Sequence, residues 1–74
     1  MYRNVVDKVE WYRKAAEQGH TCAQFSVGEM YEYGKGVDKN NSIAVEWYRK
    51  AAKRGHADAQ TSLDNLTKRL QKII

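Results

Sequence analysis

The chain has 74 residues, of which 30% are charged and 11% aromatic, and its formal net charge is +4. This length allows one domain with a small core, and this composition is typical of a folded chain rather than a disordered one. A single cysteine, Cys22, excludes an intrachain disulfide and a zinc site built on several cysteines. No stretch approaches the ~18–20 apolar residues of a membrane span, and no signal peptide is evident, so an intracellular, cytoplasmic protein is expected.

The first predicted helix covers residues 4–18. It contains the run VEWYRKAA at Val9–Ala16, which returns unchanged 36 positions later. A repeat with a period in the mid-thirties is typical of a helix–turn–helix unit. Gly19 is expected to end the helix, because glycine readily adopts the left-handed backbone conformation that closes helices. Trp11 and Tyr12, the aromatic pair of this run, are expected to be buried in the core.

The second predicted helix covers residues 21–33 and ends at the glycine-rich turn Gly34–Lys35–Gly36. Apolar residues at helical spacing predict the face that it packs on its neighbours: Ala23, Val27, Met30 and Tyr31. Gly28 lies in the middle of this helix, where glycine costs about 1 kcal/mol relative to alanine. We therefore expect the next helix to cross closely at Gly28.

The third predicted helix covers residues 40–54 and carries the second copy of VEWYRKAA. Asn40, like Asn4 in the first unit, is expected to be the N-cap, since its short side chain can accept a hydrogen bond from the first turn. Trp47 and Tyr48 are expected in the core, as the equivalents of the first aromatic pair.

The fourth predicted helix covers residues 57–72 and departs from the repeat in two ways. Asp64 takes the position that Gly28 holds in the second helix, and Leu70 takes the position of Gly34. The close-approach glycine and the helix-ending glycine are therefore both absent. Such departures from the repeat pattern are expected in the last helix of a repeat array, which caps it.

The block GHTCAQFSVGEMYEYGKGVDKNNSIAVEWYRKAAKRGHADAQ, residues 19–60, closely resembles a Sel-one-like repeat, a relative of the tetratricopeptide repeat. The typical pattern of that family is AxAQxxLGxMYxxGxGVxxDxxxAxxWYxKAAxxGH, and one departure is Asp38, where proline is common. The resemblance implies an all-α fold, a tetratricopeptide-like α/α solenoid of four antiparallel helices. Residues 1–74 would form a single domain, with one full repeat at about 21–56 between two half repeats.

The same resemblance implies a protein-interaction module or small adaptor that binds a partner protein or peptide. In this family the concave face is usually lined by the first helix of each unit, here residues 21–33 and 57–72. The candidate binding residues lie on these helices outside the packing stripe: Phe25, Glu29, Glu32, Tyr33, Thr61, Asn65, Lys68, Arg69 and Lys72. Their charges suit a peptide of mixed charge, or an acidic segment held by Lys68 and Arg69.

No enzyme activity, metal site or cofactor is predicted. His20 and His56 occupy equivalent positions, so each is interpreted as a residue that packs or forms hydrogen bonds at its turn. No HExxH spacing is present, and Gly34–Lys35–Gly36 lacks the GxxxxGK[ST] form of a phosphate-binding loop. Cys22 is interpreted as a packed or half-exposed residue rather than a reactive thiol.

Three alternatives stay open. Residues 49–74 are basic, and their cations would bind nucleic acid weakly if they formed one patch: Lys50, Lys53, Arg54, Lys68, Arg69 and Lys72. Fewer than three repeats is below what such arrays usually need, so a homo-oligomer formed through exposed end helices is a hypothesis. The chain would otherwise be a structural fragment or capping segment of a longer repeat protein, although Met1 and the modified last helix favour a self-contained chain.

Overall fold

Four helices make up the part of the chain that the computed structural model describes, which is the backbone of residues 5–71 and the side chains of residues 8–71. In chain order they are α1, Val5–Glu17; α2, Thr21–Tyr33; α3, Asn41–Lys53; and α4, Ala57–Gln71. The predicted helices agree with these bounds to within one residue at each end. The all-α prediction is therefore confirmed.

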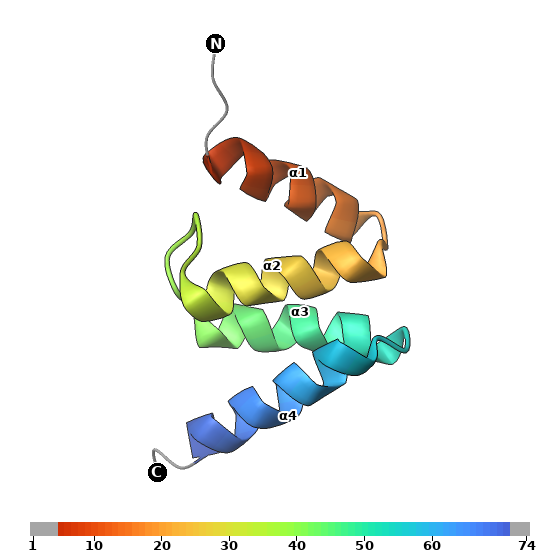
Figure 1. The fold of residues 1–74 in the computed structure, drawn as a ribbon, viewed down its shortest axis with the longest axis vertical. Coiled ribbons are helices and arrows are strands. Elements are labelled where there is room, and N and C mark those ends of the chain that lie inside the picture. Colours follow the sequence, from red (N-terminus) through yellow and green to blue (C-terminus); the bar gives the residue numbers. More distant parts are fainter. Residues whose placement is uncertain (1–4, 72–74) are drawn as a thin grey trace.

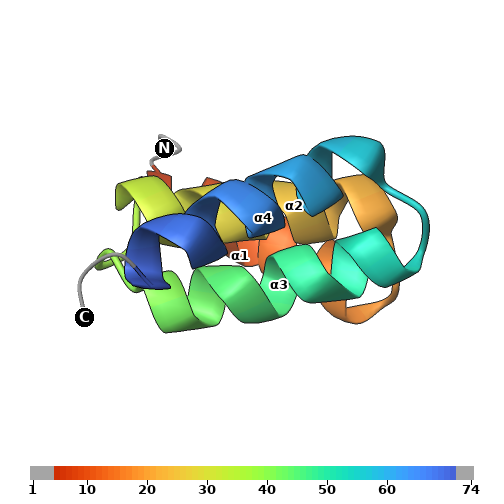
Figure 2. The same ribbon diagram turned by 90° about the horizontal axis from the view of Figure 1, so that it is seen from below.

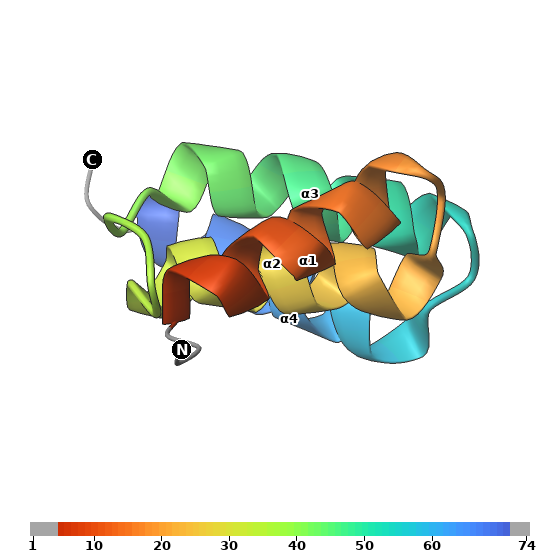
Figure 3. The ribbon, with the colours of Figure 1, turned by 90° about the horizontal axis from the view of Figure 1, so that it is seen from above.

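The helices stack in chain order, each packed on the one before it (Figure 1). α2 lies between α1 and α3, and α3 lies between α2 and α4. Viewed from below, α4 lies over α2, with α3 displaced to one side (Figure 2). From above, α1 covers the opposite end of the stack (Figure 3). The stack therefore has two end helices, α1 and α4, and two inner helices that are packed on both sides.

The turns between helices follow the predicted capping residues. Gly19 and Gly55 end α1 and α3 with backbone φ angles of 97° and 94°, a region that residues with side chains rarely adopt. Asn40 is the N-cap of α3, where its side-chain oxygen accepts a hydrogen bond from the backbone N–H of Ile43 at 3.1 Å. Asn4, the equivalent residue of the first unit, lies outside the described residues.

α2 and α3 approach most closely where Gly28 faces Tyr48. A Cβ atom at Gly28 would lie 2.6 Å from the ring carbons Cδ1 and Cε1 of Tyr48, which is too close for any side chain. Tyr48 is 0% exposed and is among the largest fully buried side chains. The close crossing predicted at Gly28 is therefore confirmed, and its cause is the ring of Tyr48.

The core consists of two clusters that follow the stack. The first is built on Ala16, Ala23 and Val27, and half-buried Tyr12, Ala15, Tyr31 and Trp47 pack against it. The second is built on Ala44, Tyr48 and Leu66, and half-buried neighbours complete it: Phe25, Tyr31, Val45, Leu63 and Leu70. The first cluster joins residues of α1, α2 and α3, and the second joins residues of α2, α3 and α4, so each cluster is shared by consecutive helices.

The prediction that Trp11 is buried in the core is wrong. Its side chain is 65% exposed, and Tyr12 beside it is half-buried. The two rings contact each other edge to face, with centroids 5.1 Å apart. The physical reason is position in the stack, because α1 packs chiefly on α2 whereas α3 packs on both α2 and α4.

Candidate protein-binding face

α2 and α4 lie on the same side of the stack, and their C-terminal ends point the same way (Figures 1 and 2). Of the predicted binding residues, the exposed ones are Tyr33, Thr61, Asn65, Lys68 and Arg69, and Glu29 is half-buried. Lys72 lies outside the described residues. The remaining two, Phe25 and Glu32, are held in the packing between helices rather than outside it.

Glu32 links three helices through its carboxylate. Its side chain is 6% exposed. Oε1 accepts a hydrogen bond of 2.6 Å from the hydroxyl of Tyr48 on α3, and Oε2 forms an ion pair with the guanidinium of Arg69 on α4. Burial, and then the hydrogen bond to Glu32 and its negative charge, raise the pKa of Tyr48 well above its ordinary value. Glu32 therefore positions Arg69 and is not itself open to a ligand.

Phe25 occupies the space between α2 and the turn that leads into α4. Its ring stacks on His56, with centroids 4.7 Å apart and planes inclined by 24°, and lies 5.7 Å from the ring of Tyr48. The helical spacing placed Phe25 and Glu32 outside the stripe that packs on α3. They are covered because α4 and its turn also pack against this side of the second unit.

The two histidines differ, although the sequence assigns them one role. His56 accepts a hydrogen bond at Nδ1 from the backbone N–H of Ala59 at 3.0 Å, as an N-cap residue does. His20, at the start of α2, is exposed and its side chain makes no capping hydrogen bond. The predicted role is confirmed for His56 and wrong for His20, since no residue of the described part of the chain covers His20 as Phe25 covers His56. Cys22, which was predicted to be packed or half-exposed, is exposed.

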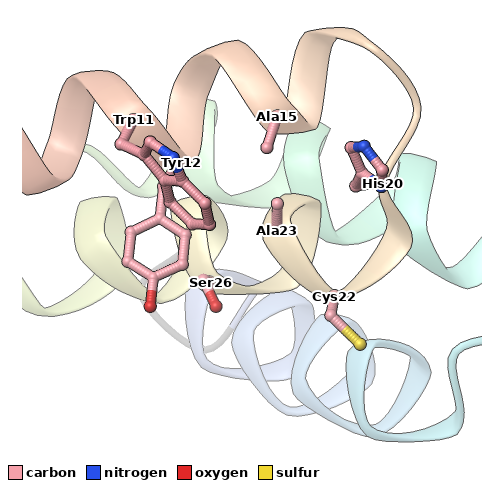
Figure 4. A pocket seen from close by; sticks show the side chains of 7 residues that line it. All are labelled: Trp11, Tyr12, Ala15, His20, Cys22, Ala23 and Ser26. Atoms are coloured by element: carbon pink, nitrogen blue, oxygen red, sulfur yellow. The ribbon is translucent and has the colours of Figure 1, made fainter.

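A groove between α1 and α2 was missed by the sequence analysis. Its volume is about 410 Å³, and its walls include Trp11, Tyr12, Ala15, His20 and Ala23 (Figure 4). In the sequence these positions look like core, because their equivalents in the second unit are core. The available signal was that no helix precedes this first half repeat, among the described residues, to cover its aromatic pair.

Metal binding and membrane spanning can each be checked against the structure. Among the described residues, no three His, Cys, Asp or Glu side chains are grouped closely enough to hold a metal ion, and no helix is long and apolar enough to cross a membrane.

The cations of the hypothetical nucleic-acid patch lie in different parts of the fold. Arg54 lies beside Gly19, at the turn between α1 and α2, whereas Arg69 lies beside Glu32 near the other end of the helices. This separation does not favour a single nucleic-acid patch.

Helical hairpins that nest in chain order, each burying its neighbour's apolar face, define the α/α repeat class of protein. The profile of the Sel1 repeat matches residues 9–20 and 23–56, and the chain belongs to this family. It is similar to a solved Sel1 repeat protein from Oxalobacter formigenes, with 48% sequence identity and a TM-score of 0.84, over 90% of this chain and 28% of that one.

A second similar protein is an exopolysaccharide production negative regulator of Rhizobium meliloti (strain 1021). It is 49% identical over 35 residues, which are 47% of this chain and 13% of the regulator. The chain therefore spans only a small part of the length of these two relatives. Sel1 repeats generally mediate protein–protein interaction, and the fold itself is a non-catalytic helical repeat.

Proposed function

We propose that the chain is a non-catalytic protein-binding module or small adaptor that holds an acidic peptide segment on the face shared by α2 and α4. The observation that carries this proposal is the ion pair between Glu32 and Arg69. The carboxylate of Glu32 is buried, while the Arg69 side chain is still 61% exposed. Arg69 is thus held in place yet open to a second carboxylate, and a positioned guanidinium donates strong charge-assisted hydrogen bonds to such groups.

Two exposed side chains adjoin this ion pair in the sequence. Lys68 precedes Arg69 on α4, and Tyr33, which follows Glu32, is 59% exposed at the end of α2. A cationic pair flanked by an aromatic side chain favours an extended acidic segment with one apolar residue, because charge gives orientation and the ring gives contact area. The regulator among the relatives is consistent with a role that depends on binding.

The test is a selection of phage-displayed random peptides on the immobilised chain, followed by affinity measurements on the enriched peptides. We expect enrichment of acidic peptides, and about tenfold weaker binding by Lys68→Glu, roughly the effect of one well-placed charge. Arg49→Glu is the matched control, because Arg49 is exposed on α3 and makes the same change of charge. Absence of acidic enrichment, or equal losses in both variants, would overturn the proposal.

The second candidate function is a structural segment of a longer repeat protein. The observation that favours it is coverage, since the chain spans 28% and 13% of its two relatives. A monomer that unfolds cooperatively in urea and binds the selected peptides would favour the adaptor. A chain that folds only when further repeats are joined to it would favour the segment, because stacked repeats stabilise one another.

A further inference from the structure

We propose that the outer side of α3 binds an anionic lipid surface through four exposed cations, Arg49, Lys50, Lys53 and Arg54, which together form a basic face. This inference goes beyond the proposed function and does not depend on it, because it concerns a second surface. Nor does it depend on the ends of the stack. α3 is an inner helix, packed on α2 and on α4, and it lies displaced to one side of both (Figure 2).

The positive charge of the chain is concentrated on the basic face. The exposed residues of α3 are Ser42, Glu46, Arg49, Lys50 and Lys53, and the exposed C-cap residue Arg54 follows them. Four cations therefore accompany a single carboxylate. On α4, by contrast, exposed carboxylates and exposed cations are equal in number. Most of the formal net charge of +4 thus lies along one side of one helix.

The internal repeat shows that the helix does not need these cations in order to end. The first copy of VEWYRKAA is followed by Glu17 and Gln18, and the second by Lys53 and Arg54, before the same Gly-His pair. Cations favour a helix C-terminus, yet α1 ends at a glycine of positive φ as α3 does, without cations at these two positions. Each of the two added cations also lies four residues after another cation, where like charges repel. The stability of α3 therefore does not explain the cluster.

Two of the four cations are held in place by neighbouring groups. The ammonium of Lys50 lies over the ring of Trp47, 4.7 Å from its centroid. The guanidinium of Arg54 lies against the turn between α1 and α2, with Nη2 2.9 Å from the position that a Cβ atom would take at Gly19. Both side chains remain exposed. Side chains that are already ordered lose less conformational freedom when they bind an anion.

The composition of the basic face favours lipid headgroups over a protein partner. None of the exposed residues of α3 is apolar or aromatic. A protein interface usually needs such residues as anchors at its centre, whereas an anionic membrane surface needs only cations. A cluster of about four Lys and Arg residues is sufficient, and each cation near the surface strengthens binding about fivefold.

The same face is a poor fit for nucleic acid. Single strands are held by aromatic rings on which bases stack, but the ring of Trp47 is covered by Lys50 and packs against the first core cluster. A duplex is read by a helix that enters its groove, and α3 is packed between α2 and α4 instead of protruding from the stack. An anionic membrane is therefore the occupant that the basic face fits best.

The test is co-sedimentation of the whole chain with phosphatidylcholine vesicles, with and without phosphatidylglycerol. We expect binding only where phosphatidylglycerol is present, and weaker binding as salt is added, because the contacts are electrostatic. Lys53→Glu gives this position the residue that Glu17 supplies in the first copy, and it should weaken binding about thirtyfold by removing one cation and adding one anion. Arg49→Gln, which only removes a cation, should weaken binding about fivefold.

Lys68→Glu is the matched control, because Lys68 is exposed on α4 and the change of charge is the same. It should weaken the binding of acidic peptides but leave vesicle binding within about twofold, and Lys53→Glu should do the reverse, so the two proposals fail separately. Circular dichroism checks that each variant is folded. Equal binding to both kinds of vesicle, or equal losses in Lys53→Glu and Lys68→Glu, would overturn the inference. So would retention of the chain by RNA, but not by phosphatidylglycerol vesicles, at the same salt concentration.

Discussion

The two copies of VEWYRKAA form helices of the same kind but occupy different environments. In α1, Trp11 is 65% exposed and Tyr12 is half-buried. In α3, Trp47 is half-buried and Tyr48 is 0% exposed. The eight residues are identical, so local sequence determines that a helix forms, whereas the neighbouring helices determine what that helix buries. In a repeat protein, a residue's contribution to stability depends on its place in the stack.

The difference extends to the residues that follow each copy. Gln24 donates from Nε2 to the carbonyl oxygen of Ala16 at 3.1 Å, and so satisfies the end of α1. Its equivalent, Gln60, donates instead to Oδ1 of Asp64 at 3.0 Å, on the same helix. Asp64 is the residue that replaces the close-approach glycine, so this substitution also redirects the neighbouring hydrogen bond.

The largest expected effect on stability concerns Tyr48, the fully buried aromatic residue of the second copy. Tyr48→Ala should lower the free energy of unfolding by about 3–5 kcal/mol, because it removes a fully buried ring and leaves the carboxylate of Glu32 without its hydroxyl donor. Tyr12→Ala should cost less than half as much, because its ring is only half-buried. Urea unfolding followed by circular dichroism measures both, and equal costs would contradict the dependence on position in the stack.

The second effect tests why α2 carries a glycine in its middle. Gly28→Ala should lower the free energy of unfolding by about 1–3 kcal/mol through the clash with the ring of Tyr48, although alanine is the better helix former by about 1 kcal/mol. In a Tyr48→Leu background the ring is gone, and the same substitution should become much less costly. A double-mutant cycle measures this coupling, and additive effects would show that the ring is not the cause.

A third effect is a pH dependence that arises from Tyr48 in the second copy. The pKa of Tyr48 is raised in the folded state, so its stabilisation is fully present below its unfolded pKa of about 10. Above that pH the unfolded chain loses this proton first, and stability falls by up to about 1.4 kcal/mol per pH unit. Unfolding titrations from pH 9 to 11.5 (roughly the window of this effect) should show that slope, and Tyr48→Phe should reduce it. An unchanged slope in Tyr48→Phe would assign the effect to other groups.

The sequence was sufficient for the features that depend on local chemistry. The four helices, the glycines that end α1 and α3 and the Asn40 cap were each predicted from a few neighbouring residues. The crossing at Gly28 was also predictable, because a glycine in the middle of a helix needs a compensating close contact.

The wrong predictions concern features that depend on residues distant in sequence. Trp11 carries the same local pattern as Trp47, and only the absence of a covering helix in the described chain makes it exposed. From the sequence alone, Glu32 was expected to be a surface carboxylate on a helix, but Tyr48 and Arg69 bind it from two other helices. Helical periodicity identifies one packing face, whereas α2 in the stack is covered by α1, α3 and the turn before α4.

The smallest effect compares the two histidines directly. His56→Ala should lower the free energy of unfolding by about 1 kcal/mol, because it removes the Nδ1 acceptor of the Ala59 N–H and the ring that stacks on Phe25. His20→Ala should change it by less than about 0.5 kcal/mol, since that ring is exposed and caps nothing. Urea unfolding of both variants measures these two changes in the free energy of unfolding, and equal changes would contradict the difference between the two histidines.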